Sequence, residues 1–249
     1  MELAVTSTFI ALAVLLFLLF LGGHEARIAT NWTPRRVRPG NAAVVSDFGY
    51  WLLGAFIPLF RFLHLTPNAL SLLSLPASLC AAIAIAIGHF GLGGPLLLFA
   101  FALDAWDGLL ARELGTASDA GEVIDATIDR YNDVILMLGF LYYYRADLVP
   151  WLLASAALVG TVVVSYARAK GESFDIDTQI GCMQRHQRAL WLGAATSIAP
   201  AVASIMNEPA GQPPRYYAVM VALGAVAIGT NITAVRRARL VIARLVSRR

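Results

Sequence analysis

Residues 103–133, LDAWDGLLARELGTASDAGEVIDATIDRYND, contain two closely spaced pairs of aspartates. Asp104 and Asp107 are three residues apart, and Asp125 and Asp129 are four apart. Residues at these separations lie on one face of a helix. A turn over residues 113–120 between two antiparallel helices therefore brings the two pairs of carboxylates to face one another.

The rest of the chain has the composition of an integral membrane protein. Its 249 residues are 58% hydrophobic and 14% charged, with a mean hydropathy of +0.67, whereas soluble domains carry about 25% charged residues. This excludes a disordered chain, a coiled coil and a typical soluble enzyme. The net charge of +3 comes from arginines and a single lysine, Lys170, and it suits anionic lipid headgroups and not nucleic acid. Cys80 and Cys182 predict neither a disulfide framework nor a metal site.

The apolar runs predict an all-α, polytopic membrane fold. Residues 1–23 are interpreted as an extra N-terminal transmembrane helix, an uncleaved span and not a signal peptide. A basic juxtamembrane linker follows at 24–48, and 49–64 is expected to form an amphipathic helix in the membrane interface. Residues 65–236 are expected to form a six-helix catalytic domain, followed by a basic tail at 237–249.

The six core spans are predicted from their length and hydropathy. Thr66 as N-cap and Pro67 at the first helical position mark the start of the first span. The predicted spans are 67–88, 94–113, 122–144, 150–170, 188–206 and 215–235. Arginines gather after the N-terminal span, at 171–187 and in the tail, so these segments are expected in the cytoplasm. The C-terminus is then inside, the N-terminus outside, and both aspartate pairs lie at the cytoplasmic ends of their helices.

Four converging carboxylates in a membrane need positive charge. Each costs about 2.5–3.5 kcal/mol inside a bilayer, and Arg112 and Arg130 are too few to neutralise all four. Oxygen ligands favour Mg²⁺ or Mn²⁺, and hard cations among carboxylates commonly serve phosphates. We therefore expect one or two divalent ions at Asp104, Asp107 and Asp125, with Asp129 at the edge.

Other interpretations of the aspartates remain open at this point. Aspartates near helix ends often act as caps, as Asp119 or Asp133 would. A single intramembrane aspartate can also be paired structurally. A proton or cation transporter would use the same four carboxylates.

The pattern Asp104-x-x-Asp107-Gly108-x-x-Ala111-Arg112, eight residues, Gly121-x-x-x-Asp125-x-x-x-Asp129 resembles the signature of the CDP-alcohol phosphatidyltransferase family. The likeness extends over about residues 45–236, and is nearest to bacterial phosphatidylinositol phosphate and phosphatidylglycerol phosphate synthases. It implies a six-helix enzyme of the bacterial inner membrane, a homodimer with its active site open to the cytoplasm. It implies transfer of a phosphatidyl or phosphoalcohol group from a CDP-linked donor to an alcohol, with release of CMP.

The same resemblance implies roles for individual residues. Two Mg²⁺ or Mn²⁺ ions are implied, with Asp129 as both a metal neighbour and the general base. The implied metal ligands are Asp104, Asp107, Asp125 and Asp129. The implied CDP-binding residues are Asn68, Asp107, Gly108, Ala111 and Arg112, although Arg112 at a helix end also suits a snorkelling side chain.

A second group of basic residues concerns the acceptor alcohol. Arg168, Lys170, Arg185 and Arg188 resemble the basic segments that line the acceptor pocket in bacterial phosphatidylinositol phosphate synthases, and guanidinium groups suit a phosphorylated acceptor. They also fit ordinary positive-inside charge, with Arg188 as an ion-pair partner of Glu172, Asp175 or Asp177. His186-Gln187 and the bulky Trp106 depart from the pattern of that subgroup.

Three functions follow as hypotheses. The first is transfer of a phosphatidyl group from CDP-diacylglycerol to a small polar alcohol such as inositol phosphate or glycerol phosphate. The second is a CDP-choline or CDP-ethanolamine phosphotransferase acting on diacylglycerol. This reaction needs no site for an acceptor phosphate, so the basic cluster argues weakly against it. The third is a non-enzymatic metal-binding membrane protein or transporter.

Overall fold

The computed structural model describes residues 2–28, 41–178, 180–181, 183–206 and 214–248, and all regular structure in these ranges is helical. The helices are α1 (Glu2–Ile28), α2 (Asn41–Gly54), α3 (Ile57–Phe62), α4 (Pro67–Ala86), α5 (Phe90–Leu114), α6 (Asp119–Tyr143), α7 (Leu148–Glu172), α8 (Arg185–Ile205) and α9 (Tyr217–Val246). The predicted all-α fold is confirmed.

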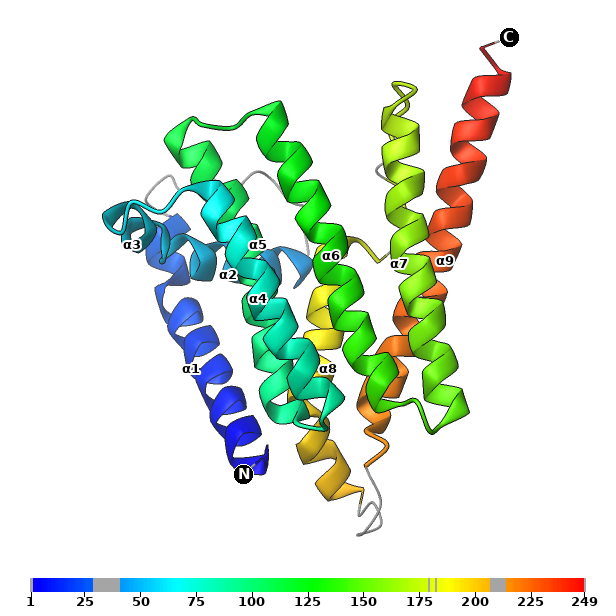
Figure 1. Cartoon of the computed structure of the whole chain (residues 1–249). Coiled ribbons are helices and arrows are strands. Elements are labelled where there is room, and N and C mark those ends of the chain that lie inside the picture. The colour runs from blue at the N-terminus through cyan, green and yellow to red at the C-terminus, as the bar shows by residue number, and fades with distance from the viewer. Residues whose placement is uncertain (1, 29–40, 179, 182, 207–213, 249) are drawn as a thin grey trace.

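Helices α4 to α9 stand side by side as one bundle (Figure 1). Helix α4 packs against both α5 and α6, α7 packs against α9, and α8 packs against α5 and α9. One buried cluster joins all six helices, with side chains such as Ile85, Phe90, Phe140, Leu192 and Leu223 at its centre. Apolar helices pack in this way in a bilayer because their backbone polar groups are satisfied internally.

Six helices among the described residues are long and apolar enough to span a membrane: α1, α4, α5, α7, α8 and α9. Helix α6 has 25 residues but carries too many charged side chains to qualify by composition alone. It lies alongside α4 within the bundle, so its length and packing are those of a spanning helix. Its carboxylates, which weaken the hydropathy signal, are those that the sequence singled out.

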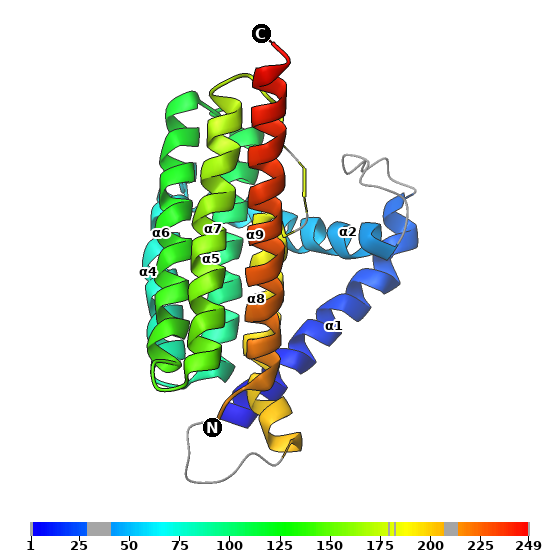
Figure 2. The ribbon, with the colours of Figure 1, turned by 90° about the vertical axis from the view of Figure 1, so that its right-hand side faces the viewer.

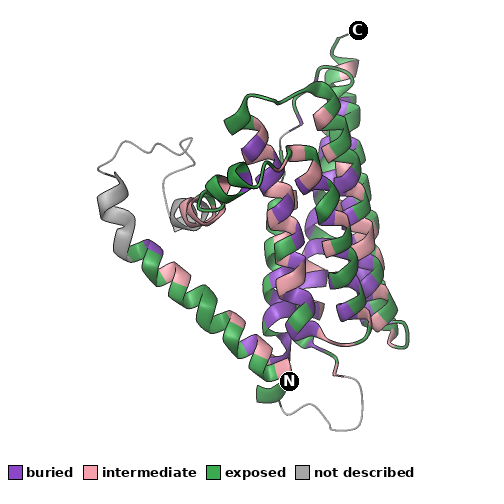
Figure 3. Ribbon diagram, turned by 60° about the vertical axis from the view of Figure 1, so that its left-hand side comes forward, coloured by how far each residue is buried: buried purple, intermediate pink, exposed green. Residues whose placement is uncertain are grey.

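Helix α1 contacts the bundle near its start and α2 near its far end. At its start, Glu2 accepts a hydrogen bond from the backbone N–H of Gly91 at 2.7 Å and lies 3.0 Å from His89 Nδ1. Near its far end, Phe20 packs against Phe48 and Trp51 of α2. Between these contacts the helix leaves the bundle obliquely (Figure 2), and most residues from 3 to 19 are exposed (Figure 3).

The segment predicted as one interfacial helix at 49–64 is divided in the structure. Helix α2 begins earlier, at Asn41, and ends at Gly54, and the short α3 starts at Ile57. Pro58 lies in the first turn of α3, where a missing N–H costs nothing, and it cannot continue α2 as a regular helix. The arginines of the predicted basic linker at positions 35, 36 and 38 lie outside the described residues, as does Cys182.

Trp106 of α5 holds this interfacial segment against the bundle. Its indole Nε1 donates to the Leu53 carbonyl at 2.8 Å, and its ring packs against Phe56, Phe60 and Phe99. Trp106 thus packs among aromatic rings, and its bulk, unexpected between two aspartates, is accommodated there.

The last helix continues past the predicted span at 215–235 and through most of the basic tail. Helix α9 continues without a break to Val246, and Arg237, placed by the sequence at the start of a tail, is buried. Its guanidinium donates to the carbonyls of Ile180 and Val164, each at 3.1 Å. These two carbonyls satisfy the guanidinium, so this arginine can be buried within the continuing helix.

Candidate active site

The two aspartate pairs are brought together by a tight turn between α5 and α6. Helix α5 ends at Gly115, which has a φ of +64° that suits glycine. Ser118 caps α6, and its hydroxyl accepts from the Gly121 N–H at 3.2 Å. The expected turn is therefore present, with Ser118 as the cap and Asp119 in the first helical turn.

Three of the carboxylates converge as a group that suits a metal ion. Ligand oxygens of Asp104, Asp107 and Asp125 all lie within 4.8 Å of one another. Among the described residues, Asp104 Oδ1 and Asp125 Oδ1 are buried without a hydrogen-bond partner. Unpartnered buried carboxylate oxygens are costly, and a hard divalent cation removes that cost. These residues fit the predicted metal.

A chain of hydrogen bonds orients Asp107, which belongs to this group. The Ser71 hydroxyl of α4 donates to Asp107 Oδ2. Ser74 donates to the Ser71 carbonyl at 2.6 Å, and Asn132 of α6 donates to the Ser74 hydroxyl at 2.7 Å. Contacts of this kind fix the orientation of metal-ligating side chains. The sequence analysis did not identify them, although serines and an asparagine within apolar spans were a usable signal.

Asp129 has different partners. It is buried, lies outside the group of three, and faces guanidinium groups. Asp129 Oδ1 lies 2.8 Å from Arg185, and its other oxygen lies 3.6 Å from Arg130. The carboxylate therefore sits between the candidate metal group and the basic residues.

A cavity of about 790 Å³ opens beside the carboxylates, between α4, α5 and the start of α6. Its lining includes every residue of the predicted CDP-binding set: Asn68, Asp107, Gly108, Ala111 and Arg112. A side chain in place of Gly108 would lie 3.5 Å from the Arg112 guanidinium, so the glycine leaves this cation accessible from the cavity. The volume is in the range of small-molecule sites.

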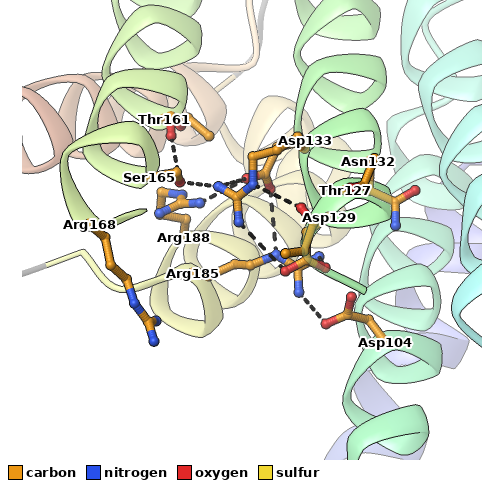
Figure 4. A network of polar contacts seen from close by, with 12 residues as sticks. Asp104, Thr127, Asp129, Asn132, Asp133, Thr161, Ser165, Arg168, Arg185 and Arg188 are labelled. Carbon is orange, nitrogen blue, oxygen red and sulfur yellow. Dashed lines mark hydrogen bonds and ion pairs between the residues drawn. The ribbon is translucent and has the colours of Figure 1, made fainter. Parts of the chain in front are cut away.

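The four predicted acceptor residues divide into two groups. Arg185 contacts Asp104 and Asp129, and Arg188 is buried with Asp133 at 3.0 Å. Arg168 instead pairs with Glu172 at 2.8 Å on the exposed end of α7. Lys170 lies 4.7 Å from the centre of the Phe174 ring. Figure 4 shows Arg185 among the aspartates and Arg168 apart from them.

The structure corrects two interpretations in this region. Arg188 pairs with Asp133 of α6 and not with Glu172, Asp175 or Asp177. Asp133 is not a cap, because it lies inside α6, where it also approaches Arg130 at 3.7 Å. Its position four residues after Asp129 places it on the same helix face, which was a signal that it belongs to the site.

Comparison with known proteins agrees with this geometry. Residues 64–243 match the CDP-alcohol phosphatidyltransferase family. The chain belongs to this family. The match spans more than half of the chain and includes both aspartate pairs, so the chain is an integral membrane protein of an enzyme family of phospholipid synthesis.

Several relatives of this family member are curated. It is 34% identical over 131 residues to the phosphatidylinositol phosphate synthase of Cutibacterium acnes, covering 51% of this chain and 63% of that protein. It is 33% identical to the archaetidylinositol phosphate synthase of Pyrococcus horikoshii, covering 51% and 67%. The Mycobacterium bovis phosphatidylinositol phosphate synthase is 30% identical, covering 70% and 77%. The chain thus spans just under two thirds of the first of these relatives.

Solved structures show the same fold. Phosphatidylinositol phosphate synthase of Mycobacterium tuberculosis with CDP-DAG bound superposes with a TM-score of 0.64 at 24% identity, covering 76% of this chain and 92% of that one. The same protein in complex with manganese and citrate gives a TM-score of 0.65, covering 76% and 88%. These matches establish the six-helix family fold for the core of this chain.

Proposed function

We propose that this protein transfers a phosphatidyl group from CDP-diacylglycerol to a phosphorylated polar alcohol, with inositol phosphate as the first candidate, and releases CMP. The observation that carries the proposal is the converging group of Asp104, Asp107 and Asp125, which lies between the large cavity and two arginines, the half-buried Arg185 and the buried Arg188. The cavity on one side of the carboxylates suits a diphosphate donor. The arginines on the other side suit a phosphorylated acceptor.

The donor is assigned to the large cavity. Asn68 and Arg112 offer polar contacts there, and Gly108 and Ala111 leave space against α5 for a nucleotide. A divalent ion, Mg²⁺ or Mn²⁺, held by the three aspartates would neutralise the diphosphate and the departing CMP. Two ions are proposed, with Asp129 as a neighbour of the second.

Asp129 is proposed as the general base. The acceptor hydroxyl oxygen attacks the phosphatidyl phosphorus, the bond from that phosphorus to the CMP oxygen breaks, and the hydroxyl proton passes to the Asp129 carboxylate. The Asp129 carboxylate oxygens lie 2.8 Å from Arg185 and 3.6 Å from Arg130. Its position between the metal group and the arginines suits that role.

The acceptor is assigned to the arginine side of the site. Arg185 and Arg188 are within reach of the carboxylates, and arginine binds phosphate with two parallel hydrogen bonds. The names of the C. acnes and P. horikoshii relatives state inositol phosphate lipids as products, which supports inositol phosphate over glycerol phosphate. Arg168 and Lys170 are proposed to act at the mouth of the site, where they are exposed.

The setting of the reaction is proposed from the sequence. The arginines at the ends of α7 and α9 support a site and a C-terminus on the cytoplasmic side of a bacterial inner membrane. A homodimer is proposed from the resemblance to the family.

The test is CMP release by the purified protein in detergent with Mg²⁺ or Mn²⁺. CDP-diacylglycerol is offered with inositol phosphate, inositol, glycerol phosphate, serine or no acceptor. We expect release of CMP only with inositol phosphate, and a raised acceptor KM for Arg185→Ala. Release with a different acceptor would correct the acceptor alone. Release only from CDP-choline or CDP-ethanolamine with diacylglycerol would replace the proposal, and ion flux in liposomes without any CMP would favour a transporter.

A further inference from the structure

Arg185 occupies the space between the two aspartate pairs. Its guanidinium contacts Asp104 Oδ2 through Nη1, lies 2.8 Å from Asp129 Oδ1 through Nη2, and lies 3.9 Å from Asp133 through Nε. The side chain is 22% exposed. It is the first residue of α8.

Asp104 belongs to two charged groups at once. It is a member of the candidate metal group with Asp107 and Asp125, and it is also a principal partner of Arg185. A divalent cation at the three aspartates would therefore stand next to a guanidinium that shares one of its ligands. Arg185 lies on Asp104 Oδ2, and Oδ1 is the oxygen left for a cation. Like charges at such a separation repel strongly where water is scarce, so a cation and Arg185 each weaken the other's binding to Asp104.

The cavity next to Arg185 is small. The cavity lined by Arg185, Arg188, Asp133 and Thr161 has a volume of about 40 Å³, which is room for only a few water molecules. While Arg185 lies on Asp104 and Asp129, this cavity cannot hold a phosphorylated alcohol. Arg188 donates to Asp133 at 3.0 Å, and displacement of Arg185 from its carboxylates would enlarge the cavity.

We propose that Arg185 is an exchangeable countercharge. It neutralises Asp104 and Asp129 in the metal-free protein, a divalent cation at Asp104 releases it, and the released guanidinium forms the phosphate-binding side of the acceptor pocket with Arg188. The phosphate part of this inference rests on the proposed function, whereas the competition with metal does not. Metal and acceptor phosphate then strengthen each other's binding by the same factor, as linkage requires.

The experiment measures Mn²⁺ binding to the purified full-length chain in detergent, with free Mn²⁺ detected by electron paramagnetic resonance. We expect Arg185→Gln to bind Mn²⁺ at least tenfold more tightly than the wild type, because a competing cation is removed. Arg168→Gln, which loses the same charge away from Asp104, should change the affinity by less than twofold. An unchanged affinity for Arg185→Gln, or equal shifts in the two variants, would overturn the proposal.

Two further arms complete the test. Inorganic phosphate, corrected with a protein-free blank, should tighten Mn²⁺ binding at least fivefold in the wild type and not in Arg185→Gln; no such coupling in the wild type would overturn the acceptor half. Should Arg185→Gln unfold, Arg185→Lys serves instead, because one ammonium cannot bridge both carboxylates, and its Mn²⁺ affinity should still exceed that of the wild type. Neither arm uses a CDP-lipid, so these results stand apart from CMP release.

Discussion

Neighbouring carboxylates of one cluster have different tasks because their partners differ. Asp107 accepts a hydrogen bond from Ser71, Asp129 faces guanidinium groups, and Asp104 and Asp125 each keep a buried oxygen without a hydrogen-bond partner among the described residues. An oxygen in the last situation gains most from a cation. We therefore propose Asp104 and Asp125 as metal ligands, and Asp129, which lies outside the group of three and faces two guanidinium groups, as the base.

We predict that Asp129→Asn lowers turnover at least a hundredfold, because the amide cannot take the hydroxyl proton. Binding of Mn²⁺ and of the CDP-lipid should remain largely intact, since Asp129 lies outside the three-aspartate group. The measurements are kcat for CMP release and direct ligand binding. The matched control is Asp147→Asn, which removes a carboxylate paired with Arg215 at the start of α7; near-normal turnover of Asp129→Asn would contradict the assignment.

Ser71 is predicted to tune the metal site without binding the metal. Replacing Ser71 by alanine leaves Asp107 free to rotate, and losses of this kind commonly cost about 10–100-fold in metal affinity. We expect Mn²⁺ binding to weaken about tenfold in Ser71→Ala. Ser155→Ala, which removes a hydroxyl bonded only to the Trp151 carbonyl of its own helix, should leave the affinity unchanged. Equal affinities in the two variants would show that the hydrogen bond has no such role.

At the scale of the elements, close approach of α4 and α6 positions the hydrogen-bonded serines beside Asn132. Gly139 of α6 makes this approach possible, because a Cβ there would lie 2.6 Å from the Ala82 carbonyl oxygen. Small residues allow membrane helices to pack backbone against backbone. The site at one end of these helices thus depends on a glycine two turns further along.

Gly139→Ala is predicted to destabilise the protein by about 1–3 kcal/mol, because α4 and α6 must separate. The matched control is Gly49→Ala in α2, where no atom lies within 4 Å of the added carbon and alanine favours the helix. Unfolding in detergent by denaturant measures both variants. Similar stabilities for the two would contradict the close packing of α4 on α6.

The indole of Trp106 holds α2 and α3 against the bundle. Trp106→Phe keeps the ring among Phe56 and Phe60 but loses the hydrogen bond to the Leu53 carbonyl, for an expected cost of about 1 kcal/mol. Trp106→Ala loses the packing too and should cost about 3–5 kcal/mol. Faster tryptic cleavage at Arg61 reports release of α3. Trp151→Phe, at a half-exposed position on α7, is the control, and the same cleavage rate in all four proteins would contradict this anchoring role.

For the whole molecule, the two termini lie at opposite ends of the bundle (Figure 1). Helix α9 has 30 residues, about 45 Å at 1.5 Å per residue, which exceeds the roughly 30 Å of bilayer hydrocarbon. Exposed arginines lie toward the end of α9, at positions 236, 239 and 244, and Arg248 follows the helix. The end of α9 therefore extends beyond the hydrocarbon on the arginine-rich side.

We predict that this end faces the cytoplasm. A fluorescent protein fused after Arg249 should fold and fluoresce, and alkaline phosphatase at the same position should be inactive. Alkaline phosphatase inserted in the turn at 145–149, at the other end of the bundle, should be active. The reverse pattern would invert the orientation and place the candidate site outside the cytoplasm.

The sequence by itself determined the chemistry and the class of fold. Apolar runs predicted the helices because burial in a bilayer demands length and hydropathy, and Thr66 caps α4 as its side chain predicted, accepting from the Ala69 N–H at 3.3 Å. The spacing of Asp104, Asp107 and Asp125 predicted their convergence because helical periodicity is a local property. The division of residues 49–64 into α2 and α3, and the start of α2 at Asn41, were not predicted, since packing partners decide such boundaries.

Only the tertiary structure decided which charges meet. That Arg188 pairs with Asp133, that Arg185 reaches Asp104 and that Ser71 holds Asp107 depend on the packing of α4, α5, α6 and α8. These contacts join residues between 36 and 81 positions apart. No local spacing rule encodes such pairs, because the helices that carry them are brought together by close packing at sites such as Gly139.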